Sequence, residues 1–251
     1  DIISKFLDNG GKYGKGLVFF ADAAAPYLPN LSAFLAEWGI EVREGIMFET
    51  NAQNHIADAP TSLGSYPNGD DEILNGIAGC ITGYNVPIKL VEPADSGIYT
   101  MSLMETLESV AVAPSNATAE WKDYDESDLD KYSGVAQAQK FTYDNENDNK
   151  PISSYIMAFG SIEYIQSEYA EQQESDNKDI VLYCTDLAAN ITTHSPLYTF
   201  KSLFQHISRI AMLTNVLSNL STNFTIGSNI HIGNFLSTKK LDLTSFGMVC
   251  P

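Results

Sequence analysis

The segment from Lys15 to Glu49 constrains the fold most. Its four consecutive apolar residues, Leu17 to Phe20, predict a strand that is buried on both faces. A helix should follow, because Pro29 suits a first helical turn, Gly39 suits a C-cap, and apolar residues recur at helical spacing: Leu28, Leu31, Leu35 and Trp38. Val42, Ile46 and Phe48 then predict a second extended segment. Strand, helix and strand indicate a βαβ unit, which implies a parallel sheet with a right-handed crossover.

Later parts of the chain continue this alternation. Apolar runs predict strands at 88–91, 98–103, 107–112, 154–159 and 179–184. Helices are predicted over 1–9, 163–173 and, from Ser195 and Pro196 onward, along a face that runs from Phe200 to Leu217. The segment 73–81 is compatible with a short helix or a strand, and we favour the helix. Residues 50–72 and the acidic segment 119–150 are predicted to be long loops. We therefore expect one α/β domain over 1–251, a three-layer sandwich with a mainly parallel sheet.

The charge of the chain excludes several classes of partner. Fourteen basic residues stand against 32 acidic ones, a formal net charge of −18. Such a surface repels nucleic acids and anionic lipid headgroups. The sequence begins at Asp1 without a basic leader, and it has no run of about 20 apolar residues that could span a bilayer. We expect a processed protein or an excised domain, attached to a membrane only through segments outside this sequence.

Several segments together resemble one family. Gly10-Gly11-Lys12 before the first strand, Pro29-Asn30-Leu31 in the helix, and Trp38-Gly39-Ile40-Glu41-Val42 after it are similar to the auxiliary proteins of ABC-type transport systems of the gliding-motility GldG type. The segments 112–120 and 179–183, with a last helix at 215–220, also resemble that family. The resemblance implies a flavodoxin-like or class I glutamine amidotransferase-like fold. It also implies a location on the extracytoplasmic side of the cell membrane and partners among transporter permease and ATPase subunits or envelope components.

Cys80 is the candidate nucleophile, because related folds include thiol amidotransferases. The sequence Ala78-Gly79-Cys80-Ile81-Thr82-Gly83 departs from the elbow pattern, since Thr82 stands where a small residue belongs. A thiolate also needs a base, and none of the four histidines has a Glu two residues after it: His55, His194, His206 and His231. With Cys184 and Cys250, the three cysteines are too few for a disulfide scaffold. We interpret Cys80 as a structural thiol.

Other candidate groups have structural interpretations. Asp22 follows the first strand, where α/β folds place functional groups, yet no phosphate-binding glycine pattern accompanies it, so we interpret it as a turn or N-cap residue. Ser161 lacks the elbow pattern of a hydrolase. The segment 144–148 alternates oxygen-bearing side chains as a calcium loop does, but it lacks the turn glycine and the distal Glu.

The sequence therefore predicts no catalytic, cofactor or metal site. We expect a non-catalytic extracytoplasmic auxiliary domain of an ABC-type transport system that binds a partner or a substrate. A hydrolase that uses Cys80 is the first alternative. A glycan-binding or small-molecule-binding module is the second, because tyrosines gather between residues 120 and 170: Tyr124, Tyr132, Tyr143, Tyr155, Tyr164 and Tyr169.

Overall fold

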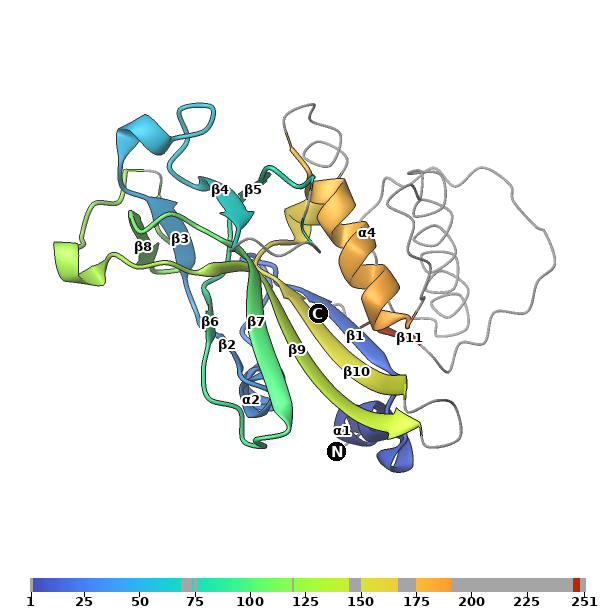
Figure 1. Ribbon diagram of the computed structural model, residues 1–251. Helices are drawn as coiled ribbons and strands as arrows, with labels where there is room; N and C mark the ends of the chain where they lie inside the picture. The colour runs from blue at the N-terminus through green and yellow to red at the C-terminus, as the bar shows by residue number, and fades with distance from the viewer. Residues whose placement is uncertain are drawn as a thin grey trace, which may run out of the picture. The chain divides into compact units, whose positions relative to one another are not determined.

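The apolar run that was predicted to be a buried strand lies in β1 (Gly16–Phe20), all five residues of which are buried. The computed structural model describes residues 2–68, 74, 76–118, 120–144, 150–166, 175–190 and 246–248. Within that part of the chain β1 has two neighbours, β10 (Lys150–Phe159) and β11 (Phe246–Met248), and it runs parallel to both. The first strand is therefore paired with segments that lie far along the sequence (Figure 1).

A single large sheet contains these strands. In the described part its order is β11-β1-β10-β9-β7-β4-β5. Every pairing from β10 to β5 is antiparallel. The four remaining strands are β9 (Ser133–Asp144), β7 (Ile98–Glu105), β4 (Ser62–Pro67) and β5 (Cys80–Gly83).

Two small antiparallel sheets share no hydrogen-bond ladder with the large one in the described part of the chain. Strand β2 (Ile40–Val42) pairs with β6 (Ile88–Leu90), and β3 (Ile46–Glu49) pairs with β8 (Val110–Ala113). The described helices are α1 (Ile2–Asp8), α2 (Pro29–Glu37) and α4 (Asn177–Ala188), with short 3₁₀ turns η1 (Asn9–Gly11), η2 (Ala52–Asn54), η4 (Glu126–Asp128) and η5 (Ile162–Ile165).

Side chains alternate between the two faces of the large sheet, as strand geometry requires. One face forms the main core with α1, α2 and β2, through buried residues that include Leu17, Phe19, Leu35, Ile40 and Ile156. Helix α4 packs against β1 and β10, and its buried residues recur at helical spacing. The helix can approach closely because Gly16 has no side chain: an added Cβ would lie 2.6 Å from Ala188 Cα.

The free edge of β5 is covered by side chains. Asn177 Nδ2 donates to Ile81 O (2.7 Å), and Asn177 Oδ1 accepts the Ile81 N–H (3.0 Å). Glu163 Oε2 accepts the Gly83 N–H (2.5 Å), and Ser161 Oγ donates to Gly83 O (2.8 Å). Asn177 thus makes the hydrogen bonds that a further strand would make, and this edge is closed to pairing with another chain.

The prediction of a three-layer α/β sandwich with a mainly parallel, flavodoxin-like or amidotransferase-like sheet is wrong. The described part is mostly β, and only the pairings of β1 with β10 and β11 are parallel. The predicted βαβ unit is not formed. The strand after α2, β2, does not join the sheet of β1, because it pairs antiparallel with β6 in a separate sheet. The extent of the domain, predicted as 1–251, includes residues outside the described ones and stays a prediction.

Several local predictions are confirmed and others are wrong. The helices at the N-terminus and after Pro29 are present, as are strands near 88–91, 98–103 and 154–159. The predicted strand 179–184 lies instead within helix α4, and the segment 107–112 contributes β8 to a two-stranded sheet. The predicted loop 50–72 contains β4, and the predicted acidic loop 119–150 contains the whole of β9. The predicted helix over 163–173 begins as the 3₁₀ turn η5, and the predicted helix beyond Pro196 lies outside the described residues.

Candidate functional site

A small pocket lies at the carboxyl end of β1. It lies between the turn that follows β1, the first residues of α2 and the loop after β2, and its volume is about 90 Å³. Its lining combines apolar side chains with three charged ones, Asp22, Arg43 and Glu44. The apolar members include Phe19, Leu31, Val42 and Val86.

The turn after β1 places Asp22 in the wall of this pocket. Asp22 Oδ1 accepts the Ala24 N–H (2.8 Å), and Asp22 O accepts the Ala25 N–H (3.0 Å). This is an Asx turn, in which the short carboxylate replaces a backbone acceptor. The chain then enters α2 at Pro29, which occupies the first turn. The prediction that Asp22 is a turn residue agrees with this geometry, and the turn directs the chain around the pocket.

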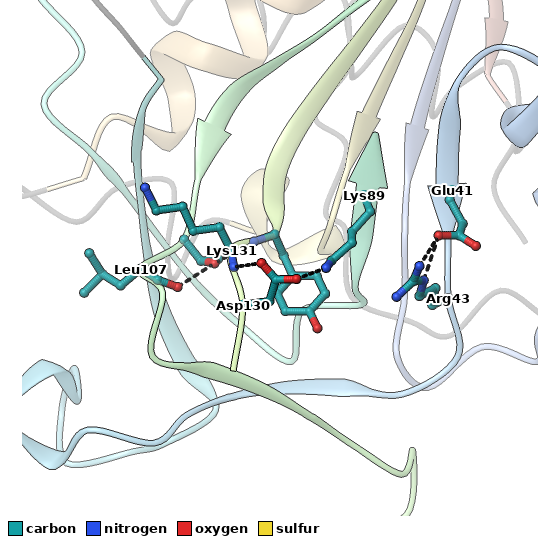
Figure 2. Close-up of polar contacts among 8 residues, drawn as sticks. Glu41, Arg43, Lys89, Leu107, Asp130 and Lys131 are labelled. Carbon is teal, nitrogen blue, oxygen red and sulfur yellow. Dashed lines mark hydrogen bonds and ion pairs between the residues drawn. The ribbon is translucent and has the colours of Figure 1, made fainter. Parts of the chain in front are cut away.

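Arg43, the basic residue of the pocket lining, is already engaged by a carboxylate, and Lys89 is engaged in the same way (Figure 2). Arg43 contacts Glu41 Oε2 through Nε (2.7 Å) and Nη2 (2.5 Å). Lys89 forms an ion pair with Asp130, and its hydrogen bond lowers the pKa of the Asp130 carboxyl. Lys131 Nζ lies 3.5 Å from Glu108 Oε1, and the Lys131 backbone N–H donates to Asp130 Oδ1 (2.8 Å). The cations are therefore compensated locally, and they do not form an anion site.

Two carboxylates of the pocket have no such compensation. Within the described part of the chain, neither Asp22 nor Glu44 has an ion-pair partner. Glu44 is exposed, and Asp22 is half-buried. Tyr27, which is 46% exposed, adds an aromatic ring to the rim. The pocket therefore offers an apolar interior and a negatively charged mouth.

Cys80, the candidate nucleophile, lies at the start of β5 and is 1% exposed. Burial raises the pKa of its thiol far above the ordinary value, and the carboxylates of Asp176 and Asp179 raise it further. Burial also raises the pKa of Cys184, which lies on α4. A nucleophilic cysteine needs the opposite environment, a thiolate stabilised by positive charge and open to solvent. The geometry therefore disfavours a Cys80-dependent hydrolase.

Alkylation provides a direct test of this conclusion. We expect iodoacetamide at neutral pH to modify Cys80 in the folded protein at least about 100-fold more slowly than in the urea-unfolded chain, because reaction requires both exposure and a thiolate. Peptide mass spectrometry would follow Cys80 and Cys184 separately, and Cys184 serves as the buried control. Rapid modification confined to Cys80 in the folded state would contradict the structural assignment.

The other predicted candidates are separated from one another. Ser161 Oγ donates to Gly83 O and accepts the Glu163 N–H (3.1 Å), so it caps the turn η5. His55 Nε2 lies 2.9 Å from Glu49 O. His194, His206, His231, Cys250 and most of the possible calcium segment 144–148 lie outside the described residues. No catalytic combination of nucleophile and base is assembled by the residues that the structure describes.

The tyrosines predicted as one population separate into two environments. Tyr132 and Tyr164 are buried, and the Tyr164 hydroxyl lies 2.8 Å from Ser65 Oγ. Tyr143 is 56% exposed. Tyr124 packs against Trp121, and Tyr169 lies outside the described residues. Which tyrosines share one surface therefore depends on the register of the strands.

Among the described residues, no group of three or more His, Cys, Asp or Glu side chains could hold a metal ion. None of the described helices is long and apolar enough to cross a membrane.

Comparisons with known proteins give little further information. The sequence matches no protein-family model and no curated protein. Among solved structures, the chain is similar to the "mmIFT52 N-terminal domain", with 13% sequence identity and a TM-score of 0.46, over 77% of this chain and 72% of that one. At these values the likeness carries no argument about function.

Sequence reasoning identified Asp22 but missed the rest of the pocket. Glu44 and Tyr27 were not singled out, although each stands next to a turn signal. Tyr27 follows Pro26, and Glu44 precedes Gly45, whose φ of 123° is unfavourable for other residues. Such positions at strand and helix ends are where binding groups concentrate. The proximity of these two turns depends on the packing of β2 beside α2, which local patterns do not reveal.

Proposed function

We propose that this chain is a non-catalytic binding domain that acts as an extracytoplasmic auxiliary domain of an ABC-type transport system. Its binding site is the pocket at the carboxyl end of β1. The observation that carries the proposal is the arrangement of Asp22 and Glu44, two carboxylates without cationic partners in the described part of the chain, at the mouth of an apolar pocket.

The size of the pocket favours a partner protein over a free small molecule. Pockets for drug-sized ligands measure roughly 300–1,000 Å³. A volume of about 90 Å³ suits a single side chain that anchors a larger surface. The interaction is then between two proteins, with one residue of the partner inserted into the pocket.

The chemistry of the pocket favours a basic anchor residue. The apolar interior, formed by residues such as Phe19 and Val42, suits the aliphatic stem of lysine or arginine. The carboxylates of Asp22 and Glu44 suit the charged end of that side chain. The net charge of −18 attracts basic partners over longer distances.

The transport context of the proposal depends on the family resemblance. The residues that carry that resemblance include Leu31 and Val42, and both line the pocket. Its partner would therefore be a permease or ATPase-associated subunit or another envelope component, and its location would be the extracytoplasmic side of the cell membrane.

The test is capture of the ABC permease and ATPase subunits encoded beside the parent gene. We expect the wild-type chain to retain the detergent-solubilised transporter and the Asp22→Asn/Glu44→Gln variant to retain about tenfold less, because a partly desolvated ion pair is lost. Asparagine preserves the acceptor oxygen that the turn at position 22 requires. Capture should also weaken with salt.

A matched control removes the same charge elsewhere. Glu37→Gln/Glu92→Gln changes two exposed carboxylates outside the pocket lining, and this variant should retain the transporter as the wild type does. Equal losses in both double variants would show a general charge effect and contradict the pocket assignment. A parent gene without neighbouring transporter genes, or transporter subunits that do not bind, would contradict the transport context.

A further inference from the structure

The three adjacent strands β7, β9 and β10 present a second surface, on the face opposite the main core (Figure 1). Opposed residues of an antiparallel pair share a face. Tyr99 is opposite Gln139, which is opposite Tyr155, and Phe141 and Tyr143 follow Gln139 at steps of two. Core residues such as Ala138 and Ile156 occupy the alternate positions. We call the surface formed by Tyr99, Gln139, Phe141, Tyr143, Ser153 and Tyr155 the aromatic face.

Its aromatic rings form a continuous row that reaches solvent. Tyr99 and Tyr143 are 59% and 56% exposed. Between them lies Phe141, whose ring centroid is 5.6 Å from that of Tyr99, at an interplanar angle of 23°, and 5.4 Å from that of Tyr143. Three neighbouring rings at the surface are unusual for a soluble protein, and exposed apolar patches of this kind commonly mark binding sites.

Uncharged hydrogen-bonding groups lie beside this row. Gln139 Nε2 donates to Ser153 Oγ (2.8 Å) and to the Tyr155 hydroxyl (3.1 Å), which fixes the amide between the strands. Gln139 Oε1 accepts no hydrogen bond from a described residue. Further along the same face, Gln137 is 7% exposed, and its Oε1 is buried without a partner among the described residues. Such buried acceptors are expected to have donors.

The composition of the aromatic face specifies the chemistry of its ligand. No Asp, Glu, Lys or Arg occupies its six positions, although the chain carries a net charge of −18. Along the aromatic face β9 is paired on both sides. Strand β7 pairs with β4 only at Met104 and Glu105, and β10 pairs with β1 only from Tyr155 onward. The recognition groups that the face itself presents are ring faces and uncharged polar side chains.

We propose that the aromatic face is a binding site for a neutral glycan. The C–H groups on one side of a pyranose ring pack against the electron-rich face of a tyrosine or phenylalanine ring. The hydroxyl groups at the edge of the sugar donate to and accept from groups such as the Gln139 amide and the tyrosine hydroxyls. A neutral sugar is also not repelled by an acidic protein. The pocket involves the opposite face of the sheet through Phe19, so the two sites are independent.

Calorimetric titration of the full 251-residue chain tests this proposal. The probes are the neutral oligosaccharides cellohexaose, xylohexaose and mannohexaose, with the anionic trigalacturonate and a decaproline peptide for comparison. We expect at least one neutral oligosaccharide to bind and trigalacturonate not to bind. Tyr99→Ala and Tyr143→Ala should each weaken binding by about tenfold, because a stacking ring is removed. Tyr99→Phe should keep most of the affinity, since the ring remains.

Two exposed tyrosines elsewhere serve as controls. Tyr84, 55% exposed, lies on another part of the surface, and Tyr84→Ala should leave glycan affinity unchanged. Tyr27→Ala changes the pocket only, and a loss of glycan binding in that variant would place the sugar in the pocket and overturn the proposal. Failure of all three neutral oligosaccharides to bind, or binding of decaproline alone, would also overturn it. None of these outcomes depends on capture of a transporter, so this proposal and the proposed function can fail separately.

Discussion

Replacing Asn177 by leucine is expected to lower the free energy of unfolding by about 2–3 kcal/mol, because a buried carboxamide that serves two backbone groups is lost. Asn177 is fully buried, and its side chain bonds both the N–H and the carbonyl of Ile81. Leucine fills a similar volume but leaves the Ile81 carbonyl without that donor. The Ile81 N–H keeps only a long contact of 3.3 Å to Ser175 Oγ.

Urea unfolding followed by circular dichroism measures this effect. Asn68→Ala is the matched control: Asn68 is exposed, and its Nδ2 donates to the Glu105 side chain (3.1 Å). We expect that variant to change the free energy of unfolding by less than about 0.5 kcal/mol. Size-exclusion chromatography adds a second readout, since the uncovered edge of β5 becomes able to pair with another copy. An Asn177→Leu protein with the stability and the elution volume of the wild type would contradict the role of the carboxamide.

Gly16→Ala is expected to destabilise the protein by about 3 kcal/mol or more, because the added methyl group meets backbone atoms that cannot rotate away. The new Cβ would lie 2.5 Å from the carbonyl carbon of Ala188 and 2.6 Å from its Cα. Relief requires the end of α4 to move away from β1. The variant should therefore lose part of the packing that α4 makes with β1 and β10.

Hydrogen exchange distinguishes a local displacement from a general loss of stability. We expect protection in Gly16→Ala to fall first for the amides of α4, with a lower urea midpoint for the whole protein. Gly97→Ala is the control, because its Cβ would meet only side-chain atoms, Asp95 Oδ1 at 3.2 Å and Lys140 Cε at 4.0 Å. Wild-type stability in Gly16→Ala would show that α4 does not lie as close to β1 as described.

Some elements could be predicted because their signals are local. The unbroken apolar run of β1 and the proline and glycine that bound α2 act within a few residues. The segment 179–184 was wrongly predicted to be a strand because a short apolar run is compatible with either element. The helical period becomes visible only over a longer stretch that includes the flanking polar residues. In that stretch Ile180, Cys184 and Ala188 are buried at steps of four residues.

Other elements could not be predicted because their signals are weak or non-local. The buried half of β9 includes the small residues Gly134, Ala136 and Ala138, which carry little hydrophobic signal within an acidic segment. Placing β2 outside the large sheet depends on its pairing with β6, in which Ile40 is opposite Leu90 and Val42 is opposite Ile88. The same holds for the aromatic face, where Tyr99 and Phe141 meet only through the register of β7 and β9.

The parallel pairing of β1 with β10 has a consequence for synthesis and for truncation. Gly16 is aligned with Tyr155 and Phe20 with Phe159, so the first strand has no partner in this pairing until the ribosome has made most of the chain. Contacts so distant in sequence carry a large loop-closure cost and slow the search for the native state. Shortened chains that end before Phe159 should leave an apolar strand exposed and aggregate. If a partner's binding site were mapped by deleting parts of this chain, the deletions would then report misfolding. Point substitutions are therefore the better tool.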